Sequence, residues 1–112
     1  MTKILIIGGT GFIGYHIIKE AKKRKWKITS ISKNRPIKNR FHKKINYTFV
    51  DTTNFKLLKK KIKGNFDYVI NAGGYGKHPK FGKKGEKLFD SHFLSLVNLV
   101  KILSKKKVKK FI

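Results

Sequence analysis

The glycine-rich segment IIGGTGFIGYHII (residues 6–18) constrains this chain more than any other feature, because four glycines fall within seven positions. The residues just before the glycines, Lys3–Ile7, form a short apolar run rich in β-branched side chains, as in a strand buried on both faces. From Phe12 to about Lys23, apolar residues recur at helical spacing, with lysines on the other side. The segment therefore predicts a strand, a tight turn and a helix.

The rest of the chain alternates between the same two kinds of element. Strands are predicted at residues 27–32, 46–50 and 68–71, helices at 54–63 and from about Glu86 to Ser104, and loops at 33–44 and 72–85. A further strand begins at residues 109–112. Strands and helices that alternate at this spacing favour parallel pairing through right-handed crossovers. The predicted fold class is α/β, a Rossmann-type doubly wound parallel sheet of about four strands plus the start of a fifth, truncated there.

The composition limits the chain to one domain and raises the question of a polyanionic partner. The chain has 112 residues and a formal net charge of +24, from 29 basic and 5 acidic residues. Such a charge favours nucleic acid or an anionic membrane surface. However, only three of the basic residues are arginines, and the lysines are spread along the whole length, which a drift toward lysine codons explains more simply. A nucleic-acid-binding protein is therefore the less favoured alternative.

Other classes of site and segment find no support in the sequence. There is no cysteine, and the four histidines lack metal-ligand spacing, so no metal site is predicted. The first apolar run is too short for a signal peptide, and no stretch approaches the roughly 20 apolar residues of a membrane span. We therefore expect a cytoplasmic protein without membrane contact.

The spacing of the glycines points to a bound pyrophosphate. Gly9, Gly11 and Gly14 satisfy GxGxxG, and Gly8, Gly11 and Gly14 satisfy GxxGxxG. After a buried strand and at the start of a helix, bare glycines let backbone N–H groups and the positive helix end approach phosphates. Gly8 and Gly11 are the candidates for the turn and the phosphate contact, and Gly14 for close packing. The alternative is a glycine turn that only connects strand to helix.

Four stretches occur in an order that matches a known family. They are IIGGTGFIG (6–14), FVDTTN (49–54), DYVINAGG (67–74) and FLSLVNLVKILSKKKVKKFI (93–112). The chain thereby resembles the N-terminal portion of the extended short-chain dehydrogenase/reductase family, the NAD(P)-dependent epimerases and dehydratases that commonly act on nucleotide sugars. The resemblance implies that residues 1–112 are an incomplete NAD(P)-binding Rossmann domain without the catalytic and substrate-binding part.

The resemblance also assigns cofactor-binding residues. It implies that the pyrophosphate is held by the turn Gly8, Gly9, Thr10, Gly11, Phe12, Ile13 and Gly14. Asp51 and Thr52 would lie at the adenine edge, and the loop Asn71, Ala72, Gly73 and Gly74 beside the ribose and nicotinamide half. The alternatives are that Asp51 caps a turn and that Asn71 pairs with a loop backbone.

The end of the second strand departs from the pattern of NAD-preferring relatives, which carry an acid there for the ribose 2′-hydroxyl. Here the residues are Ser32, Lys33, Asn34 and Arg35. A carboxylate would repel a 2′-phosphate, whereas Ser, Lys and Arg could hold one, so NADP is the preferred cofactor, with NAD as the other possibility. The alternative is that Lys33 and Arg35 merely join the basic surface.

No catalytic residue is predicted within the chain. Relatives use a YxxxK pair on a helix beyond the fifth strand, whereas the pair here, Tyr15 and Lys19, lies on the first helix. Glu86 and Asp90 are better explained as complementing a helix dipole. His92 falls where many relatives have Asn, and a lone His on a helix is more often packed or solvent-facing.

The resemblance completes the expected function and its partners. It implies the cofactor-binding part of an epimerase, dehydratase or reductase that takes a nucleotide sugar and forms a homodimer through the helix from Glu86 to Ser104, which is apolar nearly all round. A complete non-catalytic NADP(H)-binding module is the alternative that shares the same cofactor.

Overall fold

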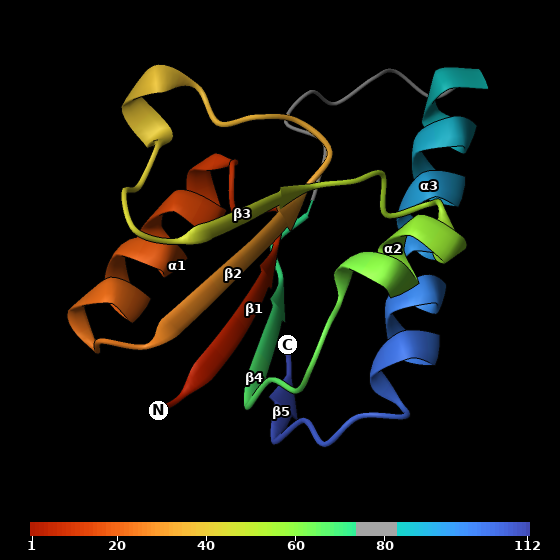
Figure 1. The fold of residues 1–112 in the computed structure, drawn as a ribbon. Coiled ribbons are helices and arrows are strands. Elements are labelled where there is room, and N and C mark those ends of the chain that lie inside the picture. The colour runs from red at the N-terminus through yellow and green to blue at the C-terminus, as the bar shows by residue number, and fades with distance from the viewer. Residues whose placement is uncertain (74–82) are drawn as a thin grey trace.

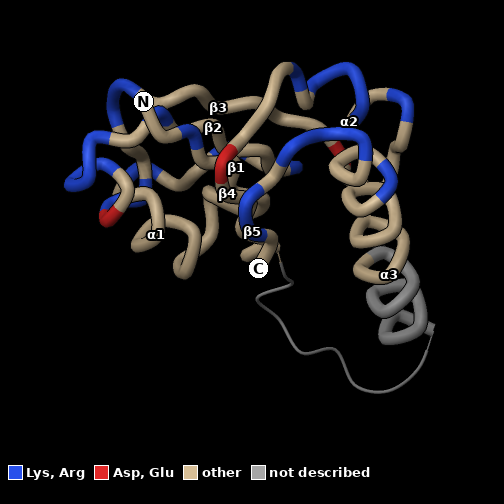
Figure 2. Tube along the Cα trace, turned by 90° about the horizontal axis from the view of Figure 1, so that it is seen from below, with Lys and Arg blue, Asp and Glu red and all other residues tan. Residues whose placement is uncertain are grey.

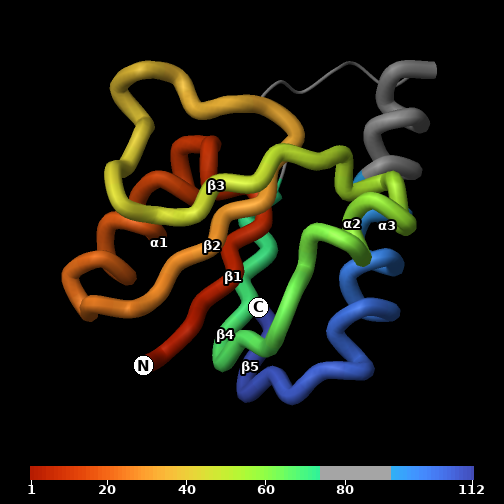
Figure 3. Tube along the Cα trace, in the orientation of Figure 1, coloured from red at the N-terminus to blue at the C-terminus, as the bar shows by residue number. Residues whose placement is uncertain are grey.

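The structure, a computed structural model, describes the backbone of residues 1–73 and 83–112 and the side chains of residues 1–73 and 92–112. Its strands are β1 (Lys3–Ile7), β2 (Lys27–Ser32), β3 (Asn46–Phe49), β4 (Tyr68–Asn71) and β5 (Lys110–Phe111), and its helices are α1 (Phe12–Lys23), α2 (Phe55–Lys61), α3 (Lys83–Leu103) and the short 3-10 helix η1 (Lys38–Arg40). The strands form one parallel sheet in the order β3-β2-β1-β4-β5. Helix α1 covers one face, and α2 and α3 cover the other (Figure 1 and Figure 3). The predicted α/β fold is confirmed.

The sheet grows outward from β1 and then reverses direction. β1, β2 and β3 are successive neighbours, after which α2 leads the chain back to the other side of β1, where β4 pairs with it. In the register, Ile4 of β1 lies between Ile28 of β2 and Tyr68 of β4. Open sheets of this kind bind ligands where the strand order reverses, beyond the carboxyl ends of the strands. Here that point lies between β1 and β4.

Residues of β1 alternate between two hydrophobic cores, one on each face of the sheet. Leu5 and Ile7 pack with residues of α2 and α3, including Leu58 and Leu99. Ile4 and Ile6 pack on the other face with residues of α1 and β2, among them Ile18, Ala21 and Ile28. This explains why the β1 sequence is a continuous apolar run, since a strand covered on both faces has no solvent-facing position.

The ends of the helices follow from local sequence. The Asn54 side chain accepts a hydrogen bond of 3.2 Å from the Leu57 backbone N–H and so begins α2. Two lysines, Lys22 and Lys23, lie in the last turn of α1, where they favour the negative end of the helix dipole. Helix α2 ends at its C-cap residue Ile62, whose backbone is extended and whose N–H donates to the Leu58 carbonyl, and Gly64 follows with a φ of 75°.

The predicted bounds agree closely with the structure for β1, α1, β2 and β4. β3 ends one residue earlier than predicted, α2 is shorter at both ends, and the predicted loop 33–44 contains η1. Helix α3 begins at Lys83, before the predicted start. A helix tolerates a single glycine such as Gly85, which costs about 1 kcal/mol relative to alanine. Of the predicted loop 72–85, residues 74–82 lie outside the described part of the chain.

Lys and Arg are distributed over both helical layers and the loops between them (Figure 2). Each of the three arginines lies over an aromatic ring of the chain itself. The guanidinium carbon is 5.5 Å from the ring centre for Arg24 over Trp26, 5.4 Å for Arg35 over Phe49 and 5.6 Å for Arg40 over Phe12. The arginines therefore take part in packing within the domain.

Within the described residues, no helix has the length and apolar character needed to span a membrane.

Candidate functional site

The carboxyl ends of four parallel strands bring most of the predicted site residues to one edge of the sheet. The turn after β1 is bonded to β2, because the Gly8 N–H donates to the Ile31 carbonyl at 2.8 Å. The segment after β4 is bonded to β1, because the Ala72 N–H donates to the Ile7 carbonyl at 2.8 Å. The Val50 N–H likewise donates to the Ser32 carbonyl at 2.9 Å. These bonds place the loops after β3, β2, β1 and β4 side by side.

The glycine turn is packed closely at Gly8 and Gly14. Gly8 has a φ of 82°, which side chains rarely adopt, and a Cβ there would lie 2.6 Å from the backbone of Gly73. A Cβ on Gly14 would collide with the Gly8 carbonyl oxygen and lie 2.6 Å from the Gly9 Cα. Both positions therefore need glycine for the packing of the protein itself. Gly14 lies within α1, and its lack of a side chain lets the helix pack closely against the turn.

Gly11 differs from these glycines, because no close contact among the described residues requires its lack of a side chain. Its backbone is extended, with a φ of −82° and a ψ of −179°, and a Cβ there would meet only the Gly8 carbonyl oxygen, at 3.6 Å. Gly11 is the N-cap of α1, where no described side chain caps the helix, and the first turn has no acidic residue. The next two side chains, Phe12 and Ile13, are 62% and 63% exposed. The positive end of α1 is therefore open to a ligand.

Ser30 lies beneath the turn and yields a first prediction. The residue is 0% exposed, and its Oγ has no hydrogen-bond partner among the described residues. A Cβ on Gly9 would collide with this Oγ. Because an unpaired buried hydroxyl is destabilising, Ser30→Ala is expected to leave the free energy of unfolding unchanged or raise it by about 1 kcal/mol, measured by urea denaturation. Ser30→Val serves as the contrast, since its added methyl group would press on Gly9 and lower stability. A loss of stability in Ser30→Ala would contradict the prediction.

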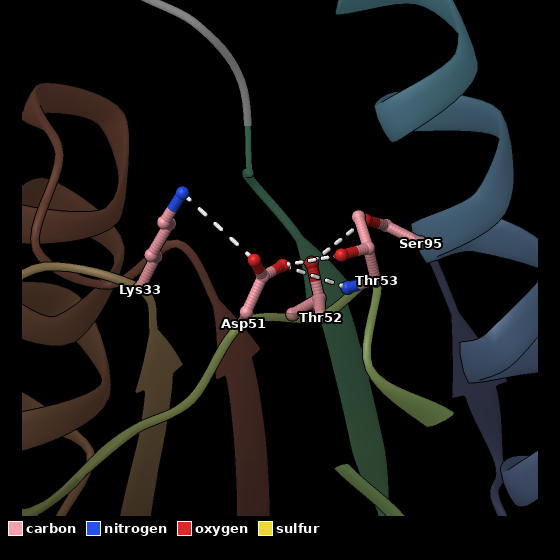
Figure 4. Close-up of polar contacts among 5 residues, drawn as sticks. All are labelled: Lys33, Asp51, Thr52, Thr53 and Ser95. Carbon is pink, nitrogen blue, oxygen red and sulfur yellow. Dashed lines mark hydrogen bonds and ion pairs between the residues drawn. The ribbon is translucent and has the colours of Figure 1, made fainter. Parts of the chain in front are cut away.

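The four residues at the end of β2 take different positions. Ser32 is buried and its Oγ accepts a hydrogen bond of 3.4 Å from the Thr10 N–H, so it faces the glycine turn. The Lys33 ammonium lies 3.8 Å from Asp51 Oδ2 (Figure 4). Asn34 is exposed, and the Arg35 guanidinium lies over Phe49. Ser32 and Lys33 are thus both brought against other predicted site residues, Ser32 against Thr10 and Lys33 against Asp51.

Asp51 both caps a turn and presents an oxygen to the edge of the sheet. Its Oδ1 accepts hydrogen bonds from the Thr53 N–H at 3.0 Å and from the Thr53 hydroxyl at 2.7 Å. These two bonds, and to a lesser extent the Lys33 ammonium, hold the pKa of the Asp51 carboxyl below its usual range. Its Oδ2 points toward Lys33 (Figure 4). Oδ1 therefore holds the turn, and Oδ2 is the carboxylate oxygen that faces Lys33.

The lowered pKa of Asp51 gives a pH-dependent prediction. A carboxyl whose pKa is depressed by folding adds stability above its unfolded pKa of about 3.9, and that stability is lost as the pH falls through the folded-state pKa. Asp51→Asn is expected to be less stable than the unchanged protein at pH 7 by about 0.5 kcal/mol, a small value because solvent screens such a side chain. In thermal melts the difference should shrink as the pH falls through the folded-state pKa of Asp51, where the carboxyl becomes protonated in both the folded and the unfolded protein. Asp67, the other carboxyl with a lowered pKa among the described side chains, is present in both proteins and cancels from the comparison. A difference that is constant with pH would therefore contradict this account.

The family of the chain follows from comparison with known proteins. A sequence profile described as the NAD dependent epimerase/dehydratase family matches residues 4–112. The chain belongs to this family. Its resemblance to the extended short-chain dehydrogenases/reductases is thereby confirmed. No curated protein matches the chain significantly in sequence.

Solved structures share the fold of this epimerase/dehydratase-family chain. A UDP-glucose 4-epimerase from Bifidobacterium longum in complex with NAD+ and UDP has 24% identity and a TM-score of 0.83, covering 98% of this chain and 36% of that one. The enzyme of the same name from Thermotoga maritima, with UDP-glucose, has 15% identity and a TM-score of 0.87, with the same coverages of 98% and 36%. A dTDP-glucose 4,6-dehydratase from Bacillus anthracis in complex with NAD has 19% identity and a TM-score of 0.74, covering 96% and 36%. This chain thus spans 36% of the length of each of these structures.

The remaining predicted residues of this family member lie as follows. Asn71 Oδ1 accepts a hydrogen bond of 3.1 Å from the Gly73 N–H, so it pairs with a loop backbone as the alternative stated. Gly74 lies outside the described residues. His92 is exposed on α3. The Tyr15 ring stacks on His42 at 4.4 Å between ring centres, which gives it a packing role on α1.

Two residues that bond to the predicted site were not assigned to it from the sequence. Ser95 and Asn98 of α3 both contact Thr52 across the sheet edge. The sequence places both residues on the predicted helix from Glu86 to Ser104. A helical period does not show which loop their side chains meet.

Proposed function

We propose that this chain is the N-terminal cofactor-binding part of an NAD(P)-dependent epimerase, dehydratase or reductase that acts on a nucleotide sugar. The observation that carries the proposal is Gly11, a glycine that the packing of the protein does not require, at the open N-terminus of α1. Membership of the epimerase/dehydratase family supports it. So do the similar structures that are named as complexes with NAD+ and UDP or with NAD.

The residues present fit a dinucleotide, whose two phosphates carry negative charge. The N–H groups at the start of α1 and the positive helix end would face the pyrophosphate, and the missing Cβ of Gly11 leaves room for its oxygens. Asp51 Oδ2 would accept a hydrogen bond at the adenine edge beside Thr52. The described segment 71–73 would lie beside the ribose and the nicotinamide. When bound, the cofactor supplies hydride transfer, for which these residues only bind and orient it.

The proposed preference for NADP rests on Lys33 and Arg35. The Lys33 ammonium lies 3.8 Å from Asp51 Oδ2, and the Lys33 side chain is 72% exposed. Because such an exposed ion pair contributes little free energy, Lys33 could exchange Asp51 for a 2′-phosphate. Arg35 is held near this position by Phe49. Ser32, whose hydroxyl faces Thr10, is the weakest of the proposed contacts. No acid stands at the end of β2 to repel the phosphate.

A homodimer through α3 is also part of the proposal. Three apolar side chains of this helix, Phe93, Leu96 and Val100, are 63%, 42% and 52% exposed. Two copies of this stripe would cover each other and remove apolar surface from water. Sedimentation velocity should show a dimer that Phe93→Lys together with Val100→Lys converts to a monomer. A monomer in the unchanged protein would refute this part of the proposal.

A cofactor titration at physiological salt tests the central proposal. NADPH and NADH should each bind saturably, by the fluorescence of the reduced nicotinamide, with NADPH the tighter by about tenfold through one charge-assisted contact. Equal affinities would refute the NADP preference alone. No saturable binding of either would refute the proposed function. Duplex DNA or RNA should bind only at low salt, because its attraction to a basic surface falls steeply with ionic strength.

A further inference from the structure

Two hydrogen bonds tie the turn that follows β3 to helix α3. The Thr52 and Ser95 hydroxyls lie 2.7 Å apart, and the Asn98 side-chain amide donates to the Thr52 carbonyl at 3.0 Å. Figure 4 shows Ser95 reaching from α3 toward Thr52, beside Asp51 and Thr53. Both the side chain and the backbone of Thr52 are therefore bonded to the same helix. We call these two bonds the α3 clamp.

The α3 clamp is set in the protected part of α3. Asn98 is only 3% exposed, and the next residue, Leu99, belongs to the main hydrophobic core. A buried amide with a definite partner has one preferred orientation, because other orientations leave its N–H groups unpaired. Side chains two positions away, Phe93 before Ser95 and Val100 after Asn98, point to another side of the helix and are exposed instead. The face of α3 that bears the clamp is thus the one fixed against the sheet.

The clamp and the Asp51 carboxylate act on the same short turn. Asp51 Oδ1 is bonded to Thr53, one residue beyond Thr52, so the turn is held from inside by Asp51 and from outside by α3. If Thr52 moves, the turn that sets the direction of Asp51 Oδ2 moves with it. Asp51 contacts neither Ser95 nor Asn98 in the hydrogen bonds of the described residues, so any effect of these two on Oδ2 passes through Thr52.

We propose that Ser95 and Asn98 are positioning residues for the adenine end of the cofactor. They hold Thr52 so that Asp51 Oδ2 faces the exocyclic amino group of adenine, which can donate a hydrogen bond to it. The inference rests on the proposed function, since it requires a dinucleotide at this edge. By this inference α3 contributes to recognition of the adenine base. Ser95 and Asn98 do so through Thr52, without touching the cofactor.

A comparison of two dinucleotides separates positioning from general stability. Nicotinamide hypoxanthine dinucleotide replaces the adenine amino group of NAD+ by a carbonyl oxygen, which cannot donate to Asp51. The unchanged protein is expected to bind NAD+ about tenfold more tightly than this analogue, measured by calorimetry, because one charge-assisted hydrogen bond is lost. In Asn98→Leu the ratio should fall to within twofold of one, and in Ser95→Ala to about threefold. A variant that is merely less stable weakens both ligands equally and keeps the ratio.

Ser104→Ala is the matched control, because among the described residues the Ser104 hydroxyl donates to the Lys101 carbonyl of α3, at 3.0 Å, and has no contact with Thr52. It should keep the tenfold ratio. Ser95→Ala, which removes one oxygen atom, keeps the test decisive should Asn98→Leu fail to fold. If Ser95→Ala and Asn98→Leu keep the tenfold ratio of the two affinities, the inference is overturned. A ratio of one in the unchanged protein also overturns it. In both cases the chain still binds a dinucleotide, so the proposed function stands. Failure of the unchanged protein to bind either dinucleotide overturns the proposed function and this inference with it.

Discussion

Gly11→Asp is expected to keep the domain fully folded and to lower its affinity for NADPH and NADH by at least 100-fold, about 2.7 kcal/mol. A Cβ at this position meets only the Gly8 carbonyl oxygen, at 3.6 Å, and the backbone is in an ordinary extended conformation. Asp is a preferred N-cap residue, and its charge suits the positive helix end, so the free energy of unfolding should be unchanged or about 1 kcal/mol higher. The same carboxylate would occupy the place of the pyrophosphate and repel it.

The measurement pairs cofactor titration with urea denaturation of the same variant. Gly64→Asp is the matched control for binding, because it adds the same charge between α2 and β4. A Cβ there has no atom within 4 Å, but the φ of 75° should lower the free energy of unfolding by about 1 kcal/mol, so only the cofactor affinity of this control is compared. The control should bind both cofactors as the unchanged protein does. If Gly11→Asp binds them equally well, the assignment of the phosphate site to the N-terminus of α1 is wrong.

Gly14→Ala is expected to destabilise the fold by about 3 kcal/mol or more, a large part of the roughly 5–15 kcal/mol that stabilises a domain. Its Cβ would collide with the Gly8 carbonyl oxygen and lie 2.6 Å from the Gly9 Cα and 2.9 Å from the Gly9 carbonyl carbon. These are backbone atoms, which cannot rotate away as a side chain can. Helix α1 or the whole turn after β1 must therefore shift.

Thermal melts should show the midpoint of Gly14→Ala lowered by about 12 °C or more. Gly11→Ala, in the same turn, should lower the free energy of unfolding by no more than about 1 kcal/mol, because it meets no close atom and only replaces Gly by a poorer N-cap residue. Similar stabilities for Gly14→Ala and Gly11→Ala would contradict the different roles assigned to the two glycines.

Much of the fold follows from the sequence alone, because its signals are local. The bounds of β1 and α1 follow from a continuous apolar run and a helical period on either side of the glycines, and both agree with the structure. The end of β3 and the length of α2 agree less well. The bounds of β3 depend on its pairing with β2, which joins residues far apart in sequence.

The candidate site divides in the same way between sequence and structure. Sequence spacing identifies the glycines as a group but cannot distinguish their roles. Gly8 and Gly14 need glycine because other backbone segments press on them, whereas Gly11 does not, and this requires the positions of neighbouring atoms. The sequence also left two alternatives open for Asp51, and the structure shows its Oδ1 in a turn and its Oδ2 toward Lys33.

The sequence by itself determined the family, the order of the strands and helices along the chain, and the segments expected to meet a cofactor, because each depends on short patterns read in succession. Only the tertiary structure decided that Gly11 is free of packing demands, that Ser32 faces the glycine turn, and that α3 holds Thr52 through Ser95 and Asn98. The physical reason is distance along the chain. The residues joined by the α3 clamp are 43 and 46 positions apart, and only the parallel sheet brings them together.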